Sequence, residues 1–325
     1  MLSRYNLIIL FSGLILTTIG FLIGRISVSN QKSKFIETRN RENYQFINPL
    51  LECESTNFSQ NAALDPLKKQ LITTIDYLKR DQQLTYASIY IRDLNVGPWL
   101  GINEEDDFSP ASLIKVPIMI TYFKAAEKNP EILKEKILTG PTTESNTQSI
   151  LPSITLIPNQ SYTVEELIEK MIIYSDNQAY ELLQNKIDNK LLAKTYTDLG
   201  IDISKAYDNP NGNIIPVKSY AAFFRILFNA SYLNKDMSEK ALSLLSKVKY
   251  SDGLVRGVNN PMVTIAHKFG ERTYEATGEK QLHDCGIIYI PQKPLLVCIM
   301  TRGNNFNNLS SSITKISKIV YQFAR

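Results

Sequence analysis

Residues 108–115 read Phe-Ser-Pro-Ala-Ser-Leu-Ile-Lys and lie between a strand-like segment and an apolar helix. Ser112 and Lys115, three residues apart, share one face of that helix start, where a neutral amine can take the proton of the hydroxyl. A helix N-terminus also favours developing negative charge. The chain holds four Ser-x-x-Lys matches: Ser29/Lys32, Ser112/Lys115, Ser246/Lys249 and Ser312/Lys315. The second alone follows a strand-like segment and a proline, which predicts Ser112 as a nucleophile.

Two further polar elements follow along the chain. Ser175-Asp176-Asn177 lies between two helical segments, and Lys268-Phe269-Gly270 follows the apolar run 263–266, which is typical of a strand. Each has a simpler interpretation. Aspartate and asparagine cap helices well, so the first could be a helix stop and restart. Lys268 could face solvent from a strand, and Ser112 with Lys115 could be an exposed helix start without chemistry.

SLIK at 112–115, SDN at 175–177 and HKFG at 267–270 resemble, in this order, the three motifs of the penicillin-recognising serine hydrolases. The flanking sequences around these motifs are most similar to the class A β-lactamase branch. The resemblance covers roughly residues 60–325. The segments along the chain follow the order helix, strands, helical block, strands and helix, with Asp65-Pro66 at the first helix start and a capping box at Thr163 and Glu166. This order indicates an α/β fold of the α+β type, in which an antiparallel sheet is flanked by helices and carries an inserted all-helical lobe.

The resemblance also implies catalytic roles for four residues. Ser112 would be the acylated nucleophile and Lys115 its general base or proton relay. Ser175 would pass a proton to the leaving nitrogen, and Lys268 would place positive charge beside Ser175 and the substrate carboxylate. Acyl transfer needs these groups around one point, so we expect Ser112, Lys115, Ser175 and Lys268 to converge between the helical lobe and the sheet.

The resemblance extends to substrate binding. Asn177 would hold the amide side chain of the substrate, and the backbone N–H groups of Ser112 and Glu271 would form the oxyanion hole. Phe269 and Gly270 complete the implied substrate-binding set. The implied partner is a β-lactam or an acyl-D-alanyl peptide. No metal and no cofactor are implied.

Two positions depart from the family pattern. Phe269 stands where the third motif normally carries a threonine or serine hydroxyl that binds a substrate carboxylate, and Arg272 could compensate. The stretch 199–217 lacks the glutamate with which efficient class A enzymes activate the deacylating water. Asp202 and Asp208 are its only carboxylates, and both are expected to be turn residues. Acylation with slow deacylation is therefore expected.

Three functions stay open. The first is a serine acyl-enzyme hydrolase of the class A β-lactamase type. The second is a peptidoglycan D,D-carboxypeptidase or transpeptidase on the same scaffold. The third is a non-catalytic receptor domain, which Phe269 and the missing glutamate would suit.

Composition limits the class of protein. Of 325 residues, 43% are hydrophobic and 21% are charged, close to the averages of folded soluble proteins. This excludes a disordered chain and a multispan membrane protein. The net charge of +4 is small and spread along the chain, so no nucleic-acid partner is predicted. The sequence leaves the oligomeric state open.

The N-terminal segment reads as a membrane anchor. Leu7–Gly24 is uncharged, lies between Arg4 and Arg25, and as a helix would reach about 27 Å, enough to span a bilayer core. We expect a single-pass protein of the cell membrane with an extracytoplasmic catalytic domain. The alternative is secretion after cleavage near Ser29. The expected organisation is an anchor at 1–25, a polar tether at 26–45 and a catalytic domain at 46–325, whose α/β lobe is 46–110 with 217–325 and whose helical lobe is 111–216.

The cysteines and histidines are expected to be structural. Folding the hairpin of residues 286–300 about Gln292 would place Cys285 opposite Ile299, so that Cys298 would point to the other face. A disulfide between the two cysteines is therefore not expected, and both are predicted to be buried apolar residues. His267 and His283 are predicted to have packing roles.

Overall fold

The computed structural model describes residues 18, 37–39, 44–53, 62–141, 146–201 and 212–325. Within these residues no helix is both long and apolar enough to cross a membrane. Apart from residue 18, the predicted anchor Leu7–Gly24 and the alternative cleavage position at Ser29 lie outside the described residues, so both stay predictions.

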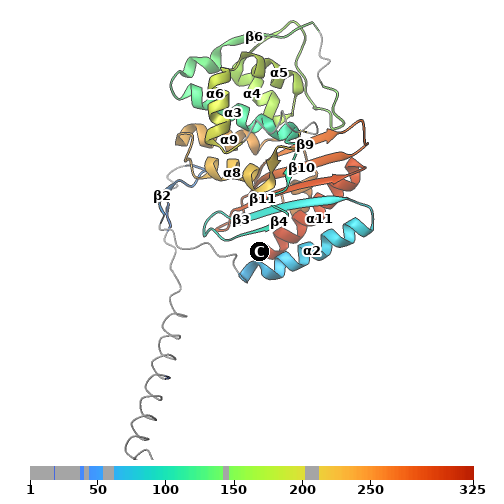
Figure 1. Ribbon diagram of the computed structural model, residues 1–325. Coiled ribbons are helices and arrows are strands. Elements are labelled where there is room, and N and C mark those ends of the chain that lie inside the picture. Colours follow the sequence, from blue (N-terminus) through green and yellow to red (C-terminus); the bar gives the residue numbers. More distant parts are fainter. Residues whose placement is uncertain (1–17, 19–36, 40–43, 54–61, 142–145, 202–211) are drawn as a thin grey trace, which may run out of the picture.

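A five-stranded antiparallel sheet forms the centre of the fold (Figure 1). Its strands, in spatial order, are β4 (Trp99–Ile102), β3 (Tyr86–Asp93), β11 (Leu295–Gly303), β10 (Lys280–Ile288) and β9 (Ile265–Thr273). The hairpin of β3 and β4 pairs Ile89 with Ile102, and β9 lies at the opposite edge. The third sequence motif therefore lies on an edge strand.

Three helices cover one face of the sheet: α2 (Asp65–Arg80), α10 (Gly253–Val258) and α11 (Phe306–Ala324). The Asp65-Pro66 pair starts α2, as a proline in the first turn allows. The apolar side chains of α2 recur at helical spacing and are buried: Leu67, Leu71, Ile75 and Leu78. They pack with the apolar stripe of α11 and with one face of the sheet into one hydrophobic core.

The other face carries the helical part of the molecule (Figure 1). Its helices are α3 (Lys115–Ala126), α4 (Val164–Ile173), α5 (Asn177–Lys186), α6 (Asn189–Asp198), α8 (Val217–Phe228) and α9 (Lys235–Leu245). Thr163 caps α4 in a capping box with Glu166. α8 and α9 share the core of α3–α6, although they come from the segment assigned to the α/β lobe. The lobe boundaries stay predictions, while the α+β architecture is confirmed.

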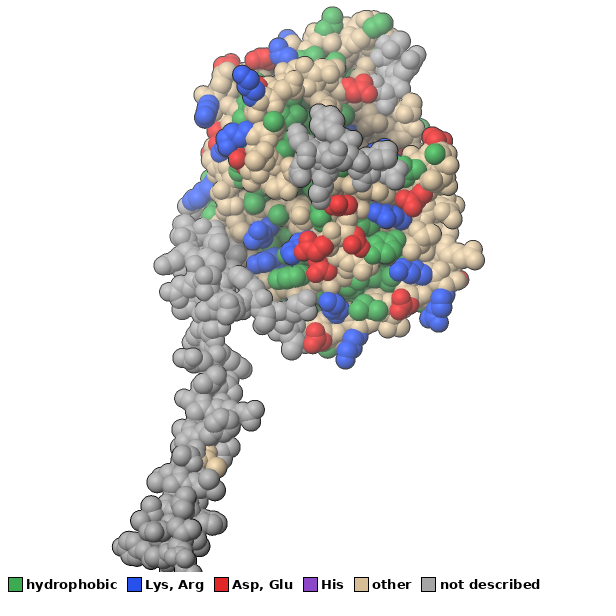
Figure 2. Space-filling view, in the orientation of Figure 1, with side chains coloured by type: hydrophobic (Ala, Val, Ile, Leu, Met, Phe, Trp, Pro, Cys, Tyr) green, Lys and Arg blue, Asp and Glu red, His purple; other side chains and the backbone are tan. Residues whose placement is uncertain are grey.

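Short elements complete the chain. The two-stranded pairs are β1 (Glu37–Arg39) with β2 (Leu50–Cys53), β5 (Asp107–Phe108) with β8 (Ile215–Pro216), and β6 (Lys136–Leu138) with β7 (Ser161–Thr163). The 3₁₀ turns are η1 (Ala62–Leu64), η2 (Ala111–Ile114) and η3 (Pro130–Lys134). On the face in Figure 2, basic and acidic side chains are interspersed, so the small net charge is not concentrated there.

The hairpin of β10 and β11 corrects the prediction for the cysteines. Ile288 pairs with Leu295, so the fold-over point lies between Pro291 and Gln292 rather than on Gln292. This shift of one residue brings Cys285 directly opposite Cys298, and the two form a disulfide with a Cα–Cα distance of 3.9 Å. The prediction of no disulfide was wrong because a one-residue slip moves a side chain to the other face. Both cysteines are buried, as predicted.

Residues 45–48, at the start of the predicted catalytic domain, are attached to α9 by one carboxylate. The backbone N–H groups of Gln45, Phe46 and Ile47 donate to the Glu239 carboxylate at 2.7–3.0 Å. The side chains of Phe46 and Ile47 are buried in the core of the helical side. Asn48 N–H also donates to the carbonyl of Phe228 at 2.7 Å. This segment is therefore part of the folded domain.

We expect Glu239→Ala to lower the free energy of unfolding by about 2 kcal/mol or more, since hydrogen bonds to a charged group contribute about 1.5–3 kcal/mol. Urea unfolding of the two proteins measures the difference. Glu169→Ala, at an exposed position on α4, is the matched control and is expected to change stability by less than about 0.5 kcal/mol. Equal stability of the Glu239 variant and the wild type would contradict the attachment.

Candidate active site

Ser112 lies in the turn η2, directly before α3. Ala111 has a φ of +47°, an uncommon left-handed conformation for a residue with a Cβ, and such strain clusters at functional sites. The Ser112 side chain is half-buried. A Cβ at Gly270 would lie 3.1 Å from the backbone nitrogens of both Ser112 and Leu113, so glycine lets β9 approach this turn closely. The next residue on β9 is Glu271, and its N–H as an oxyanion donor stays a prediction.

Lys115 is the first residue of α3 and is 1% exposed. Its Nζ donates to the carbonyl of Ser175 at 2.7 Å, to the hydroxyl of Ser175 at 3.3 Å and to Oδ1 of Asn177 at 2.6 Å. The amine is thus turned toward Ser175 and Asn177. Catalytic hydrogen bonds often tighten only when substrate binds, so this arrangement is compatible with a later approach to the Ser112 hydroxyl.

Lys268 approaches the same serine from β9. Its side chain is fully buried, and Nζ donates to the Ser175 hydroxyl at 2.9 Å and to the Phe269 carbonyl at 2.9 Å. The hydroxyl of Ser175 therefore lies between two lysine amines. Ser175 itself has a φ of +58°. Of the four residues expected to converge, Lys115, Ser175 and Lys268 meet through hydrogen bonds between the helices and the sheet. Ser112 is placed near them by its turn beside Gly270, and the catalytic roles of all four stay predictions.

Lys115 and Lys268 both have pKa values below the ordinary value of a lysine. Burial lowers the pKa of Lys115 to about 7, against the nearby carboxylates of Asp176 and Glu181, which raise it. Burial also lowers the pKa of Lys268 well below its ordinary value, and the neighbouring Lys115 lowers it further. Lys115 can therefore be neutral near pH 7, as a proton acceptor must be.

The second motif, at the corner between α4 and α5, both caps a helix and supplies polar side chains to the site. Asp176 is buried and caps α5, because its Oδ1 accepts a hydrogen bond from Ala179 N at 2.8 Å. Its two neighbours, Ser175 and Asn177, supply the contacts to Lys115. The capping residue thus fixes the turn that presents the two polar side chains.

Residues 146–150, here called the strap, are a part of the site that has no sequence signature. Asn177 Nδ2 donates to Gln148 Oε1 at 2.7 Å, and Asn177 N donates to Asn146 Oδ1 at 2.8 Å. Ile150 N donates to Glu271 Oε1 at 2.7 Å. Burial raises the pKa of Glu271, although the backbone N–H groups of the strap lower it. Polar residues in a connecting segment gave no signal by which sequence could find these contacts.

Phe269 is a packing residue in this structure. Its ring is 4% exposed and stacks on Tyr250 with a centroid distance of 4.3 Å, and the Lys268 amine lies 4.2 Å from its ring centroid. Arg272, on the same strand, donates from Nη1 to the hydroxyl of Ser109 at 3.1 Å. Arg272 thus turns toward the segment that carries the predicted nucleophile, as a compensating cation would need to do.

We expect Phe269→Thr to lower the free energy of unfolding by about 3 kcal/mol, because truncating a buried aromatic ring leaves a cavity. Urea unfolding measures the difference. Phe323→Thr, at a position that is 38% exposed on α11, is the control and is expected to lower stability by less than half as much. Acylation rates of the Phe269 variant are then compared at a temperature at which both proteins are folded, since the new hydroxyl is expected to speed acylation. A fully stable Phe269 variant would contradict the packing role.

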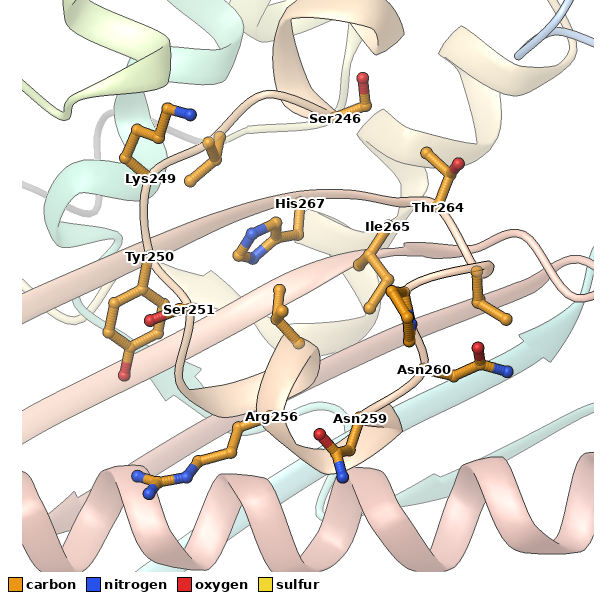
Figure 3. A pocket seen from close by; sticks show the side chains of 14 residues that line it. Ser246, Lys249, Tyr250, Ser251, Arg256, Asn259, Asn260, Thr264, Ile265 and His267 are labelled. Atoms are coloured by element: carbon orange, nitrogen blue, oxygen red, sulfur yellow. The ribbon is translucent and has the colours of Figure 1, made fainter.

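The two other described Ser-x-x-Lys pairs do not form such a site. Ser246 donates to the carbonyl of Ser243 at 2.8 Å, and Figure 3 shows that Ser246 and Lys249 lie well apart at the rim of a cavity of about 720 Å³. Ser312 donates to the carbonyl of Asn308 at 2.8 Å within α11. Ser29 and Lys32 lie outside the described residues, as do Asp202 and Asp208.

The histidines have structural partners. His267, which also lines the cavity in Figure 3, contacts Asp284 through Nδ1 at 2.8 Å, and both side chains are buried. His283 Nε2 lies 3.0 Å from the carbonyl of Ser109. Burial lowers the pKa of His283 to about 3. These contacts fit the predicted packing roles.

Comparisons with known proteins identify a family from the sequence and a fold from the structure. The profile of the "Beta-lactamase enzyme family" matches residues 67–324. PBP-A is 22% identical over 82% of this chain and 98% of its own, with a TM-score of 0.65. β-Lactamases from Sphaerobacter thermophilus and Chitinophaga pinensis are 20% and 17% identical, with TM-scores of 0.67 and 0.66. The first covers 78% of this chain and 96% of its own, and the second 79% and 100%.

These identities establish likeness of fold. A search of curated protein sequences finds no significant match. The family profile spans most of the chain and includes all three sequence motifs. The chain belongs to the β-lactamase enzyme family.

Proposed function

We propose that this serine hydrolase forms an acyl-enzyme with β-lactams at Ser112, in the manner of class A enzymes. The observation that carries the proposal is the hydrogen-bonded cluster of Lys115, Ser175 and Lys268 beside the turn of Ser112. On the same fold, a variant of PBP-A has been solved as an acyl-enzyme with penicillin G, at 21% identity and a TM-score of 0.64.

In the proposed acylation, Ser112 Oγ attacks the lactam carbonyl carbon while its proton passes to neutral Lys115. The carbon–nitrogen bond of the ring then breaks, and the leaving nitrogen receives a proton through the hydroxyl of Ser175. Lys268, which donates to that hydroxyl, adds positive charge for the substrate carboxylate. The product is an ester on Ser112 and a free amine. Water then hydrolyses the ester.

We propose that the last step is slow. The stretch 199–217 contains no glutamate, and Asp202 and Asp208 are its only carboxylates. An aspartate is one methylene shorter than a glutamate, so its carboxylate reaches less far toward a deacylating water. The ester would therefore outlive the acylation step.

A peptidoglycan D,D-carboxypeptidase or transpeptidase is the second candidate, and the missing glutamate favours the transpeptidase. An enzyme that passes its acyl group to an amine does not depend on an activated water. A non-catalytic receptor is the third candidate, since Phe269 supplies no hydroxyl to a substrate carboxylate. It is weakened by the low pKa of Lys115, because a receptor has no need of a neutral lysine.

A fluorescent penicillin distinguishes these functions. An enzyme of either kind would be labelled in the wild type and unlabelled in Ser112→Ala, whereas a receptor would be labelled in neither. Hydrolysis of nitrocefin would then indicate a β-lactamase, and release of D-alanine from an acyl-D-alanyl-D-alanine peptide would indicate a peptidase. Labelling of the Ser112 variant as strong as that of the wild type would overturn the proposed nucleophile.

We also propose that Leu7–Gly24 anchors the protein in the cell membrane with its catalytic domain outside. The support is the uncharged run, which is long enough for a bilayer core. Alkaline extraction of membranes would leave an anchored protein in the pellet. Release of a shortened chain that begins near residue 30 would instead indicate cleavage.

A further inference from the structure

We propose that Gln148 occupies the place of a substrate's acylamino side chain, so that the site favours β-lactams that lack this group. The inference rests on the proposed function, because it assumes that β-lactams acylate Ser112 and that Asn177 binds their amide. It adds a specificity determinant and a preferred substrate class that the three sequence motifs do not predict.

The hydrogen bonds of the Asn177 side chain already use both of its polar atoms. Its Oδ1 accepts a hydrogen bond from Lys115 Nζ at 2.6 Å, so its Nδ2 is the atom that can donate to a substrate carbonyl. That atom donates to Gln148 Oε1 at 2.7 Å. Gln148 Nε2 also lies 3.4 Å from the Ser175 carbonyl. The carboxamide of Gln148 is the same chemical group as a substrate amide. Its oxygen binds Asn177 Nδ2 and its nitrogen faces the Ser175 carbonyl, the two atoms that a substrate amide would contact at this corner.

The strap is held on both sides of the site. On the helical side, Asn146 accepts from Asn177 N and donates through Nδ2 to Asp176 Oδ2 at 3.1 Å. On the sheet side, Ile150 N donates to Glu271 Oε1 at 2.7 Å, and Ile150 packs against the core below the sheet. The strap therefore runs from the start of α5 to the edge strand β9. Displacing Gln148 means breaking a contact in a segment that is attached at both ends.

A substrate pair isolates this effect. Benzylpenicillin and 6-aminopenicillanic acid share one bicyclic nucleus, and the first carries a phenylacetyl group on the amine of the second. Benzylpenicillin alone would have to displace Gln148. Removing the carboxamide should therefore help benzylpenicillin more than 6-aminopenicillanic acid. We expect Gln148→Ala to raise the ratio of their acylation rate constants about 5- to 10-fold, the effect of one hydrogen bond.

The experiment measures both acylation rate constants by stopped flow on the full-length chain in detergent. Thr147→Ala, at the exposed neighbouring position of the strap, is the matched control and is expected to leave the ratio unchanged. Gln148→Ser repeats the test if the alanine variant folds poorly, and it is expected to raise the ratio in the same direction. An unchanged ratio in both Gln148 variants would overturn the inference. Failure of both compounds to acylate any of the proteins would overturn the proposed function and this inference with it.

Discussion

Replacing Lys115 by methionine is expected to slow acylation of Ser112 by about 10²- to 10⁴-fold, the usual contribution of a general base. Methionine has a similar length and no amine, so it removes the proton acceptor and the hydrogen bonds to Ser175 and Asn177 together. Arginine is a less suitable replacement, because it would place a larger, permanently charged group where the lysine is 1% exposed. Stopped-flow acylation by a chromogenic cephalosporin measures the loss.

In the wild-type enzyme, the pH dependence of the acylation rate constant should follow the protonation of Lys115. The pKa of Lys115 is about 7, so the amine is neutral above pH 7 and protonated below it. The acylation rate constant is expected to rise about tenfold per pH unit below pH 7 and to level off above it. Lys128→Met, at an exposed position two residues after the end of α3, is the control and should keep both the rate and the profile. A flat profile, or full activity of the Lys115 variant, would exclude Lys115 as the base.

The penicillin acyl-enzyme on Ser112 is expected to persist for minutes or longer. An ordinary enzyme turns over about 10 times per second, and loss of one general base lowers such a rate by about 10²- to 10⁴-fold. A lifetime of minutes corresponds to the larger of these losses, a deacylation rate of about 0.001 per second. The cause is the stretch 199–217, which contains no glutamate to activate water.

Nitrocefin in excess over enzyme tests this expectation. A burst near one equivalent of product, followed by a slow linear phase, would agree with it. Sustained turnover above about 10 per second would contradict it. In that case Asp202→Asn and Asp208→Asn would show which of the two carboxylates activates the water.

Local sequence rules predicted much of this fold. Asp65-Pro66 marks the start of α2, Thr163 with Glu166 caps α4, and Asp176 caps α5, because each feature depends on residues a few positions apart. The order of helix, strands, helical block, strands and helix then indicated the architecture. The approach of Lys268 to Ser175, 93 positions apart, followed from the family resemblance and not from any local rule.

The missed features depend on tertiary placement. The predicted register of β10 and β11 was wrong by one residue in the loop that joins them. Because side chains alternate between the two faces of a sheet along each strand, that one residue decides whether Cys285 and Cys298 face each other and form a disulfide. The strap contacts of Gln148 and Ile150 join segments far apart in the chain. Phe269 was interpreted through the hydroxyl that it replaces, whereas the structure shows what its ring does against Tyr250.

The most direct test of the central claim is peptide mapping by mass spectrometry after brief incubation with benzylpenicillin. The account predicts one penicilloyl group per chain, on the peptide that contains Ser112, and no adduct in Ser112→Ala. An unmodified protein under these conditions would contradict the account. So would an adduct on any other residue that survives in the Ser112→Ala variant.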